Sequence, residues 1–254
     1  MSLRLWLAFL IILVATVSCK PNSQDGIENP ENILFIGNSY TFINDMPEIF
    51  TGLAELGGHE VSVTTLAKAG YSLMEHAEDP QTREVIQSNN WDYIILQEKS
   101  SLPFLDLDAT ADGISHVMEM AAAQGANLIL FLPWAYQSGF PEAGLEDYQA
   151  MQSKATEVYL DLGRDFRIQV APVGFAWQSA LEQDPALELW SIDGSHPSLL
   201  GSYLAAATFY ALIFQEHLPS NQIPESDSAD VEIINMLGEI VAETVLGTPG
   251  KWNP

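Results

Sequence analysis

The feature that most constrains the fold is a regular alternation of short apolar runs with longer amphipathic segments. Segments typical of strands cover 33–36, 61–66, 93–96, 127–132 and 166–171. The segments at 33–36, 93–96 and 127–132 are nearly all apolar, as in strands buried on both faces, whereas 61–66 mixes valine and leucine with serine and threonine. Apolar residues at helical spacing occupy 45–57, 108–124, 144–163, 198–217 and 228–246. Repeated strand–helix–strand units place parallel strands in one sheet with helices on both faces. The sequence therefore predicts a three-layer α/β/α sandwich with a central parallel five-stranded sheet.

The first apolar run ends in a polar turn that carries a serine. Gly37-Asn38-Ser39-Tyr40-Thr41 follows the run directly, and glycine, asparagine and serine favour a turn after a strand. Open α/β sheets bind their ligands at the carboxyl ends of the strands. The Ser39 hydroxyl is therefore expected at the ligand-binding edge. It is either a nucleophile or a turn serine that caps a helix.

A second polar segment supplies the groups that a serine nucleophile needs. Asp193 and His196 lie three residues apart in a loop that also contains Gly194 and Pro197. A hydroxyl is a weak nucleophile unless a neighbouring imidazole accepts its proton. The imidazole in turn needs an acceptor on its other nitrogen. We therefore expect Ser39, His196 and Asp193 to act as nucleophile, general base and orienting carboxylate. The alternatives are a surface histidine and a turn-forming aspartate.

Together these two segments resemble the first and last sequence blocks of the SGNH (GDSL-like) hydrolase superfamily. Asn38 stands where the commoner first block has aspartate, and Asp-Gly-Ser-His-Pro at 193–197 resembles the last block closely. The similarity extends over residues 31 to 215. It implies an SGNH fold, related in its layers to flavodoxin, and serine hydrolase activity.

The resemblance also implies an oxyanion hole formed by the Ser39 N–H, a glycine N–H and a side-chain amide. Ala-Lys-Ala-Gly-Tyr-Ser at 67–72 fits the second block, with Gly70 as the glycine. The third block is usually Gly-x-Asn-Asp, but here Gln-Glu-Lys-Ser-Ser follows the strand at 93–96. Gln97 carries the same amide on a longer stem and is the expected donor. Ser100 is the alternative.

Other motifs suggest a pocket but no cofactor. Trp134 and Tyr136 follow the fourth strand, so they are expected either to line a substrate pocket or to pack in the core. The histidines form no zinc-binding pattern with one another or with the single cysteine. The chain also lacks a Walker lysine and the dinucleotide glycine spacing. We therefore expect no metal and no cofactor.

The amino-terminal segment predicts export. Arg4 precedes an apolar run over 5–17, which is shorter than the about 20 residues of a membrane helix and has the form of a signal peptide. The run ends at Thr-Val-Ser-Cys-Lys, which resembles a bacterial lipoprotein signal, and Cys19 is the only cysteine. The alternatives are an ordinary cleaved signal and an uncleaved anchor.

These features divide the chain into three parts. A signal peptide is expected over 1–18, a tether rich in polar residues over 19–32 and a single SGNH-like domain over 33–254. The protein is then exported and attached to a bacterial membrane through a lipid on Cys19, facing the periplasm or the cell surface.

The charge balance argues against some partners. The chain has 34 acidic and 9 basic residues and a formal net charge of −25. Such a surface repels nucleic acid and anionic lipid, so no nucleic-acid partner is expected.

The expected activity is hydrolysis of a carboxylic ester through an acyl-Ser39 intermediate. A secreted, tethered enzyme of this kind resembles those that remove acetyl groups from polysaccharides, so O-acetyl or short acyl groups on carbohydrate are the expected substrate class. Two alternatives remain. One is a non-catalytic glycan-binding lipoprotein on the same fold, favoured by the altered third block, and the other is an acyltransferase.

Overall fold

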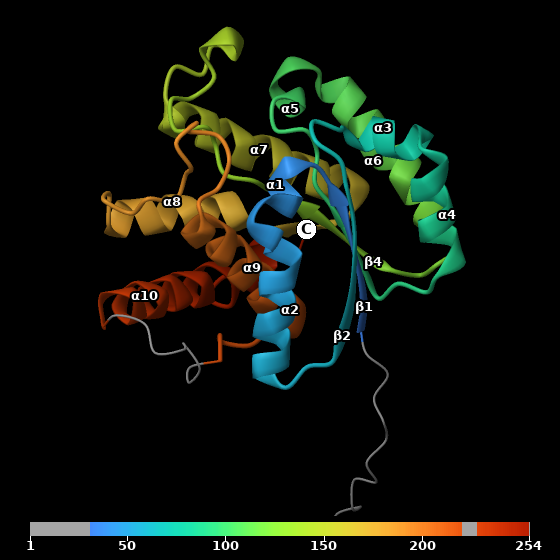
Figure 1. Cartoon of the computed structure of the whole chain (residues 1–254). Helices are drawn as coiled ribbons and strands as arrows, with labels where there is room; N and C mark the ends of the chain where they lie inside the picture. Colours follow the sequence, from blue (N-terminus) through green and yellow to red (C-terminus); the bar gives the residue numbers. More distant parts are fainter. Residues whose placement is uncertain (1–30, 220–227, 254) are drawn as a thin grey trace, which may run out of the picture.

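The computed structural model describes residues 31–219 and 228–253 and builds them around one sheet (Figure 1). The strands are β1 (Glu31–Gly37), β2 (Val61–Ala67), β3 (Tyr93–Leu96), β4 (Asn127–Phe131) and β5 (Gln169–Ala171), in the order β2-β1-β3-β4-β5. All neighbouring strands run parallel. The predicted α/β fold with a five-stranded parallel sheet is therefore confirmed.

Helices connect the strands and cover both faces of the sheet (Figure 1). They are α1 (Ser39–Phe42), α2 (Met46–Gly57), α3 (Leu73–Glu78), α4 (Pro80–Ser88), α5 (Leu102–Leu105), α6 (Leu107–Ala121), α7 (Tyr148–Phe166), α8 (Val173–Gln183), α9 (Leu199–Phe214) and α10 (Ser228–Val245). Turns of 3₁₀ helix lie at Ile43–Asp45, Pro141–Ala143 and Pro249–Lys251.

Alternation along β1 separates two hydrophobic cores. Ile33 and Phe35 face the core formed with α2, α8, α9 and α10. Leu34 and Ile36 face the opposite core, formed with α3, α4, α6 and α7. All four side chains are fully buried, as expected for a central strand covered on both faces. The end of β1, where Ser39 follows, is thus fixed from both sides.

Several predicted boundaries need correction. The tether predicted over 19–32 overlaps β1, because Glu31 and Asn32 pair with β2. The strand predicted over 166–171 begins only at Gln169, since Phe166 ends α7 and Arg167 closes that helix in the left-handed conformation (φ 56°). The helix predicted over 45–57 begins only at Met46, because Asp45 is also left-handed (φ 52°), and the Asp45 side chain makes no cap hydrogen bond.

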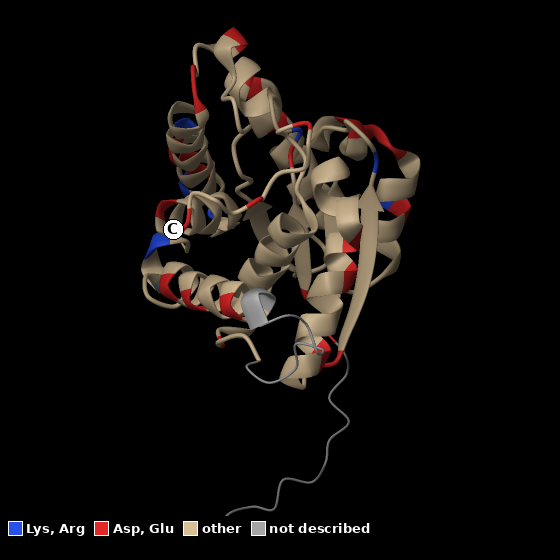
Figure 2. Cartoon of the chain, turned by 60° about the vertical axis from the view of Figure 1, so that its left-hand side comes forward, with Lys and Arg blue, Asp and Glu red and all other residues tan. Residues whose placement is uncertain are grey.

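The predicted signal peptide and Cys19 lie outside the described residues. None of the helices within those residues combines the length and the apolarity that a membrane crossing requires. Acidic residues are spread over the outer helices, with few Lys and Arg among them (Figure 2). A surface of this kind repels polyanions.

Candidate active site

The candidate site lies at the carboxyl edge of the sheet, where segments that follow several strands converge. Ser39 follows β1, Gly70 follows β2, Gln97 follows β3 and Tyr136 follows β4. The segment over 191–198 precedes α9 and reaches the same edge. This convergence is what a parallel sheet imposes, since the carboxyl ends of all its strands share one edge.

The turn that carries Ser39 is held by hydrogen bonds from Asn38. Asn38 is the N-cap of α1, and its Oδ1 accepts from the Tyr40 N–H at 3.1 Å. Its Nδ2 donates to the Tyr71 carbonyl at 3.0 Å, which ties the turn to the segment containing Gly70. Asparagine is well suited to this cap, because its side chain both accepts and donates.

Gly37 is required at the end of β1 by close packing. A Cβ atom there would lie 2.6 Å from the Gln97 Oε1 and would also collide with the Thr41 hydroxyl. The glycine in the Gly-Asn-Ser sequence therefore allows the segment after β3 to pass directly beneath the turn.

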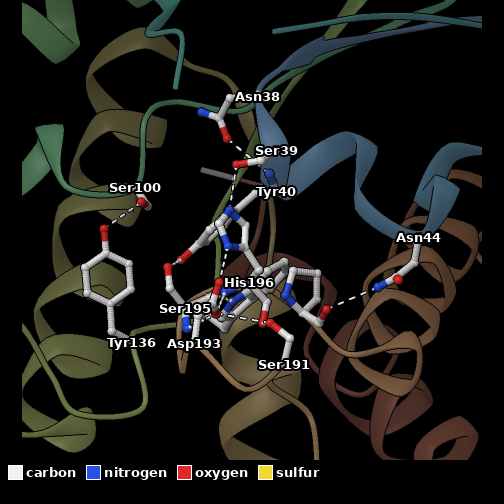
Figure 3. A network of polar contacts seen from close by, with 12 residues as sticks. Asn38, Ser39, Tyr40, Asn44, Ser100, Tyr136, Ser191, Asp193, Ser195 and His196 are labelled. Atoms are coloured by element: carbon white, nitrogen blue, oxygen red, sulfur yellow. Dashed lines mark hydrogen bonds and ion pairs between the residues drawn. The ribbon is translucent and has the colours of Figure 1, made fainter. Parts of the chain in front are cut away.

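Asp193, His196 and Ser39 form a continuous chain of hydrogen bonds (Figure 3). The His196 Nδ1 lies 2.6 Å from the Asp193 Oδ2, and the His196 Nε2 lies 2.9 Å from the Ser39 Oγ. With Nδ1–H donating to the carboxylate, Nε2 is free to accept the serine proton. The structure thus brings together the three residues that the sequence singled out.

The loop orients Asp193 through its second oxygen. The Asp193 Oδ1 accepts from the Ser195 and His196 N–H groups, both at 2.9 Å, and from the Ser191 hydroxyl at 3.0 Å. The hydrogen bond to His196 is the main cause that lowers the pKa of Asp193, and the Ser195 N–H contributes further. Asp193 is therefore ionised at neutral pH and keeps the acceptor that His196 needs.

A second set of contacts holds the His196 loop against the turn. The Tyr40 hydroxyl lies 2.9 Å from the Ser195 Oγ, and the Trp134 Nε1 donates to the Ser195 carbonyl at 2.9 Å. The Tyr40 and Trp134 rings stack at 4.6 Å. Burial raises the pKa of the Tyr40 hydroxyl, although its hydrogen bond with Ser195 acts in the opposite direction.

Trp134 is a core residue and not a wall of a substrate pocket. It is only 1% exposed and stacks on Trp177 at 4.4 Å as well as on Tyr40. The prediction that Trp134 lines a pocket is therefore corrected. Its hydrogen bond to the Ser195 carbonyl supports the loop that carries His196.

Gly70 lies in the turn from Lys68 to Tyr71, in which the Tyr71 N–H donates to the Lys68 carbonyl at 3.1 Å. Its φ of 71° is the left-handed conformation that this turn position requires and that glycine adopts without strain. Gly70 is exposed at the edge of the site, where its N–H is a candidate donor.

Gln97 does not present its amide to the site. The side chain is fully buried, and its Oε1 accepts from the Asn38 N–H at 2.8 Å and from the Thr41 hydroxyl at 3.0 Å. Its Nε2 donates to the Glu98 carbonyl. This geometry corrects the prediction of Gln97 as an oxyanion donor, because the longer stem folds the amide beneath the turn.

Ser100 and Tyr136 form a hydroxyl pair beside the site. The Ser100 Oγ and the Tyr136 hydroxyl lie 2.7 Å apart, and both side chains are partly exposed. Figure 3 shows them to one side of the Ser39–His196 pair. Tyr136 also packs edge-on against Phe140 at 5.8 Å. In the described part of the chain, no group of three or more His, Cys, Asp or Glu residues gathers to hold a metal ion.

Comparison with solved structures confirms the resemblance to the SGNH (GDSL-like) hydrolase superfamily, because the chain has the fold of SGNH hydrolases. An SGNH hydrolase candidate from Slackia heliotrinireducens superposes with a TM-score of 0.63 at 29% identity, over 73% of this chain and all of the other. The chain matches no family model and no curated protein sequence.

Two further solved structures share the fold. A DUF4886 family protein from Bacteroides uniformis superposes with a TM-score of 0.67 at 17% identity, over 87% of this chain and 96% of the other. An acetyl xylan esterase from Geobacillus stearothermophilus superposes with a TM-score of 0.54 at 16% identity, over 70% of this chain and 92% of the other.

Proposed function

We propose that the protein is a serine esterase in which Ser39 attacks the carbonyl carbon of a carboxylic ester. The observation that carries this proposal is the unbroken hydrogen-bond chain from Asp193 through His196 to Ser39. His196 takes the Ser39 proton during attack and gives it to the departing alcohol, while Asp193 stabilises the imidazolium. Water activated by His196 then hydrolyses the acyl-Ser39 ester.

The oxyanion that develops during attack is stabilised by the N–H groups of Ser39 and Gly70 and by the Ser100 hydroxyl. Ser39 is the first residue of α1, so its N–H has no carbonyl partner within that helix. Ser100 takes the place first expected for Gln97, because it is a partly exposed hydroxyl of the third block and lies beside the Ser39–His196 pair (Figure 3). One such donor changes kcat by about 10²–10³-fold in serine hydrolases.

The proposed substrates are O-acetyl or short acyl groups on carbohydrate. The partly exposed Tyr136 ring offers an apolar face against which a sugar ring packs, and the Ser100–Tyr136 hydroxyl pair offers polar partners. The similarity of fold to an acetyl xylan esterase supports the same substrate class.

The proposed chemistry is tested on 4-nitrophenyl acetate and on acetylated xylan. Ser39→Ala and His196→Ala are compared with the parent protein and with His116→Ala, which changes an exposed histidine on α6. The parent and His116→Ala are expected to hydrolyse both substrates, and the two site variants to lose several orders of magnitude in kcat. Equal rates in all four proteins would exclude the Ser39–His196 mechanism.

Non-catalytic glycan binding is the second candidate, and the altered third block favours it. A binder retains affinity for acetylated xylan but neither hydrolyses it nor reacts at Ser39 with a fluorophosphonate. An acyltransferase differs from a hydrolase in its product, since an added alcohol acceptor then receives the acyl group. Product analysis with and without the acceptor separates the two enzymes.

The proposed location is outside the cytoplasm of a bacterium, with a lipid on Cys19 holding the protein to a membrane. The support is the sequence of the amino-terminal segment and the position of the single cysteine at its end. The same location suits an enzyme that acts on large carbohydrates, which do not cross a membrane.

A further inference from the structure

The peptide bond that immediately precedes the nucleophile turn is held at both of its polar ends. The Gly37 carbonyl accepts from the His76 Nε2 at 2.7 Å and from the Lys68 N–H at 3.1 Å. On the other side of the same peptide, the Asn38 N–H donates to the Gln97 Oε1 at 2.8 Å. Two buried side chains, from α3 and from the segment after β3, therefore fix the orientation of one peptide plane.

The His76 ring has a defined tautomer in this arrangement. A carbonyl only accepts, so Nε2 must carry the hydrogen that faces Gly37. Nδ1 then accepts from the Thr82 hydroxyl, which lies 3.3 Å away on α4. Both side chains are buried, and His76 has no exposed surface. Burial lowers the pKa of His76 and the nearby Lys68 acts in the same direction, while the Gly37 carbonyl opposes them.

Burial of the His76 imidazole has a desolvation cost that an apolar side chain at the same position would not have. Burying an imidazole is unfavourable unless its nitrogens are satisfied, and an apolar residue would fill the same position in α3 without that requirement. Both His76 nitrogens form hydrogen bonds here, and Nε2 donates to the Gly37 carbonyl, two residues before Ser39. The next peptide, Asn38–Ser39, carries the Ser39 N–H and is connected to the clamped plane only through the φ and ψ of Asn38 (−136° and −149°), so the clamped plane sets where Ser39 begins.

We propose that His76 and Gln97 are positioning residues that clamp the Gly37–Asn38 peptide and thereby aim Ser39 at His196. Gln97 thus acts from beneath the turn, as an acceptor for the Asn38 N–H, and not as a donor to the oxyanion. The proposal rests on the proposed function, because it assigns a purpose to the direction of the Ser39 hydroxyl. We call this pair of contacts the peptide clamp.

The test uses the whole protein and six variants, four of them at His76 and Gln97. His76→Leu removes both imidazole contacts, whereas His76→Gln keeps an amide donor for the Gly37 carbonyl. Gln97→Leu removes the acceptor of the Asn38 N–H, whereas Gln97→Glu keeps an acceptor oxygen there. For each protein, kcat and KM for 4-nitrophenyl acetate and the rate of Ser39 labelling by a fluorophosphonate are measured, and circular dichroism checks the fold.

Each apolar variant is expected to lower kcat and the labelling rate by about 10- to 100-fold, since small displacements of a reacting group cost up to about 10²-fold. KM should stay near the parent value, because no substrate contact is removed. His76→Gln and Gln97→Glu should each recover most of the loss. Thr82→Val, which removes only the partner of Nδ1, should have a smaller effect than His76→Leu.

The peptide clamp is overturned if folded His76→Leu and Gln97→Leu both keep the parent kcat and labelling rate. It is also overturned if the conservative and apolar variants are equally impaired. Should His76→Leu not fold, the pair at Gln97 decides in the same way. Ser39→Ala separates failure of the esterase proposal from failure of the peptide clamp. A parent rate in Ser39→Ala rejects the esterase proposal and the clamp with it, whereas loss in Ser39→Ala alone rejects only the clamp.

Discussion

The Tyr40 hydroxyl lies 2.9 Å from the Ser195 Oγ, and each of these residues is the sequence neighbour of a residue in the proposed triad. Those triad residues are Ser39 and His196, and the His196 Nε2 also lies 2.9 Å from the Ser39 Oγ. Two adjacent contacts thus connect the turn after β1 with the loop before α9. Two hydrogen bonds side by side resist rotation of the turn against the loop, whereas a single hydrogen bond would allow it.

The first prediction concerns this second contact. Tyr40→Phe keeps the ring that stacks on Trp134 but removes the hydroxyl. It is expected to destabilise the protein by about 1 kcal/mol and to lower kcat by about 5- to 10-fold, a barrier increase of the same size. Urea unfolding and steady-state kinetics provide the measurements. Tyr159→Phe is the matched control, because the hydroxyl of this buried tyrosine has no partner within the described residues. A larger effect in the control than in Tyr40→Phe contradicts the prediction.

A second prediction addresses the role of Asp193. Asp193→Asn removes the charge that favours the Nδ1–H tautomer of His196 and stabilises its protonated form. We expect kcat to fall by about 10³–10⁴-fold, as the loss of the orienting carboxylate does in other serine hydrolases. Asp184→Asn serves as the control, since Asp184 also accepts a backbone N–H in an exposed turn, from Ala186 at 2.9 Å. A similar loss in both variants would point to folding of the loops and not to the triad.

A third prediction is a pH dependence of stability that arises at Glu98. Its carboxylate is 1% exposed and accepts from the N–H groups of Leu73 (3.1 Å) and Lys99 (2.6 Å), but its Oε2 has no partner among the described residues. Burial raises the pKa of Glu98 from 4.5 to about 7. Folding then favours the protonated form, so stability is greatest below pH 4.5 for this group and falls as the pH rises towards 7.

The slope of this fall is at most about 1.4 kcal/mol per pH unit. Glu98→Gln cannot ionise and should lose this component between pH 4.5 and 7, when urea unfolding is measured across that interval. Glu119→Gln, at an exposed position on α6, should retain the parent dependence. An unchanged pH profile in Glu98→Gln argues against the raised pKa.

A fourth prediction separates Trp134 from Tyr136. Trp134→Ala removes a buried ring from the core and should lower the free energy of unfolding by about 3–5 kcal/mol. Tyr136→Ala removes a partly exposed ring and should change stability little, while raising KM for acetylated xylan more than KM for 4-nitrophenyl acetate. Unfolding and kinetics on both esters give the comparison. The assignment of Tyr136 to the substrate side fails if the two KM values rise together.

A fifth prediction tests the proposed anchor. Cys19→Ala should move the protein from the membrane fraction to the soluble fraction of a bacterial host, and should abolish incorporation of labelled palmitate. Ser18→Ala is the neighbouring control and should leave the protein with the membranes. Membrane association that survives in Cys19→Ala would favour an uncleaved anchor.

Much of the fold and the arrangement of the proposed triad could be predicted because the relevant signals are local. The apolar run before Ser39 is short and uninterrupted, and Asp193 and His196 stand in one loop, so spacing alone relates them. The parallel sheet then supplies the long-range information, since it brings the carboxyl ends of its strands to one edge. The distance between Ser39 and His196 follows from that topology more than from either segment.

The side-chain directions could not be predicted in this way. Gln97 has the amide expected of an oxyanion donor, but its direction depends on the space left by Gly37, which only the packed structure reveals. His76 lies in a helix of six residues, too short for a clear hydrophobic period. Trp134 follows a strand as pocket residues do, yet stacking on Tyr40 and Trp177 places it in the core.

The direction of β1 has a consequence if this chain is attached to a surface through residues that precede Glu31. The chain enters the sheet at one end of β1 and reaches Ser39 at the other (Figure 1). Seven residues at about 3.3 Å each make this strand a rigid spacer of about 23 Å. An attachment through those residues therefore joins the domain at the end of β1 opposite the candidate active site, one strand length away from Ser39.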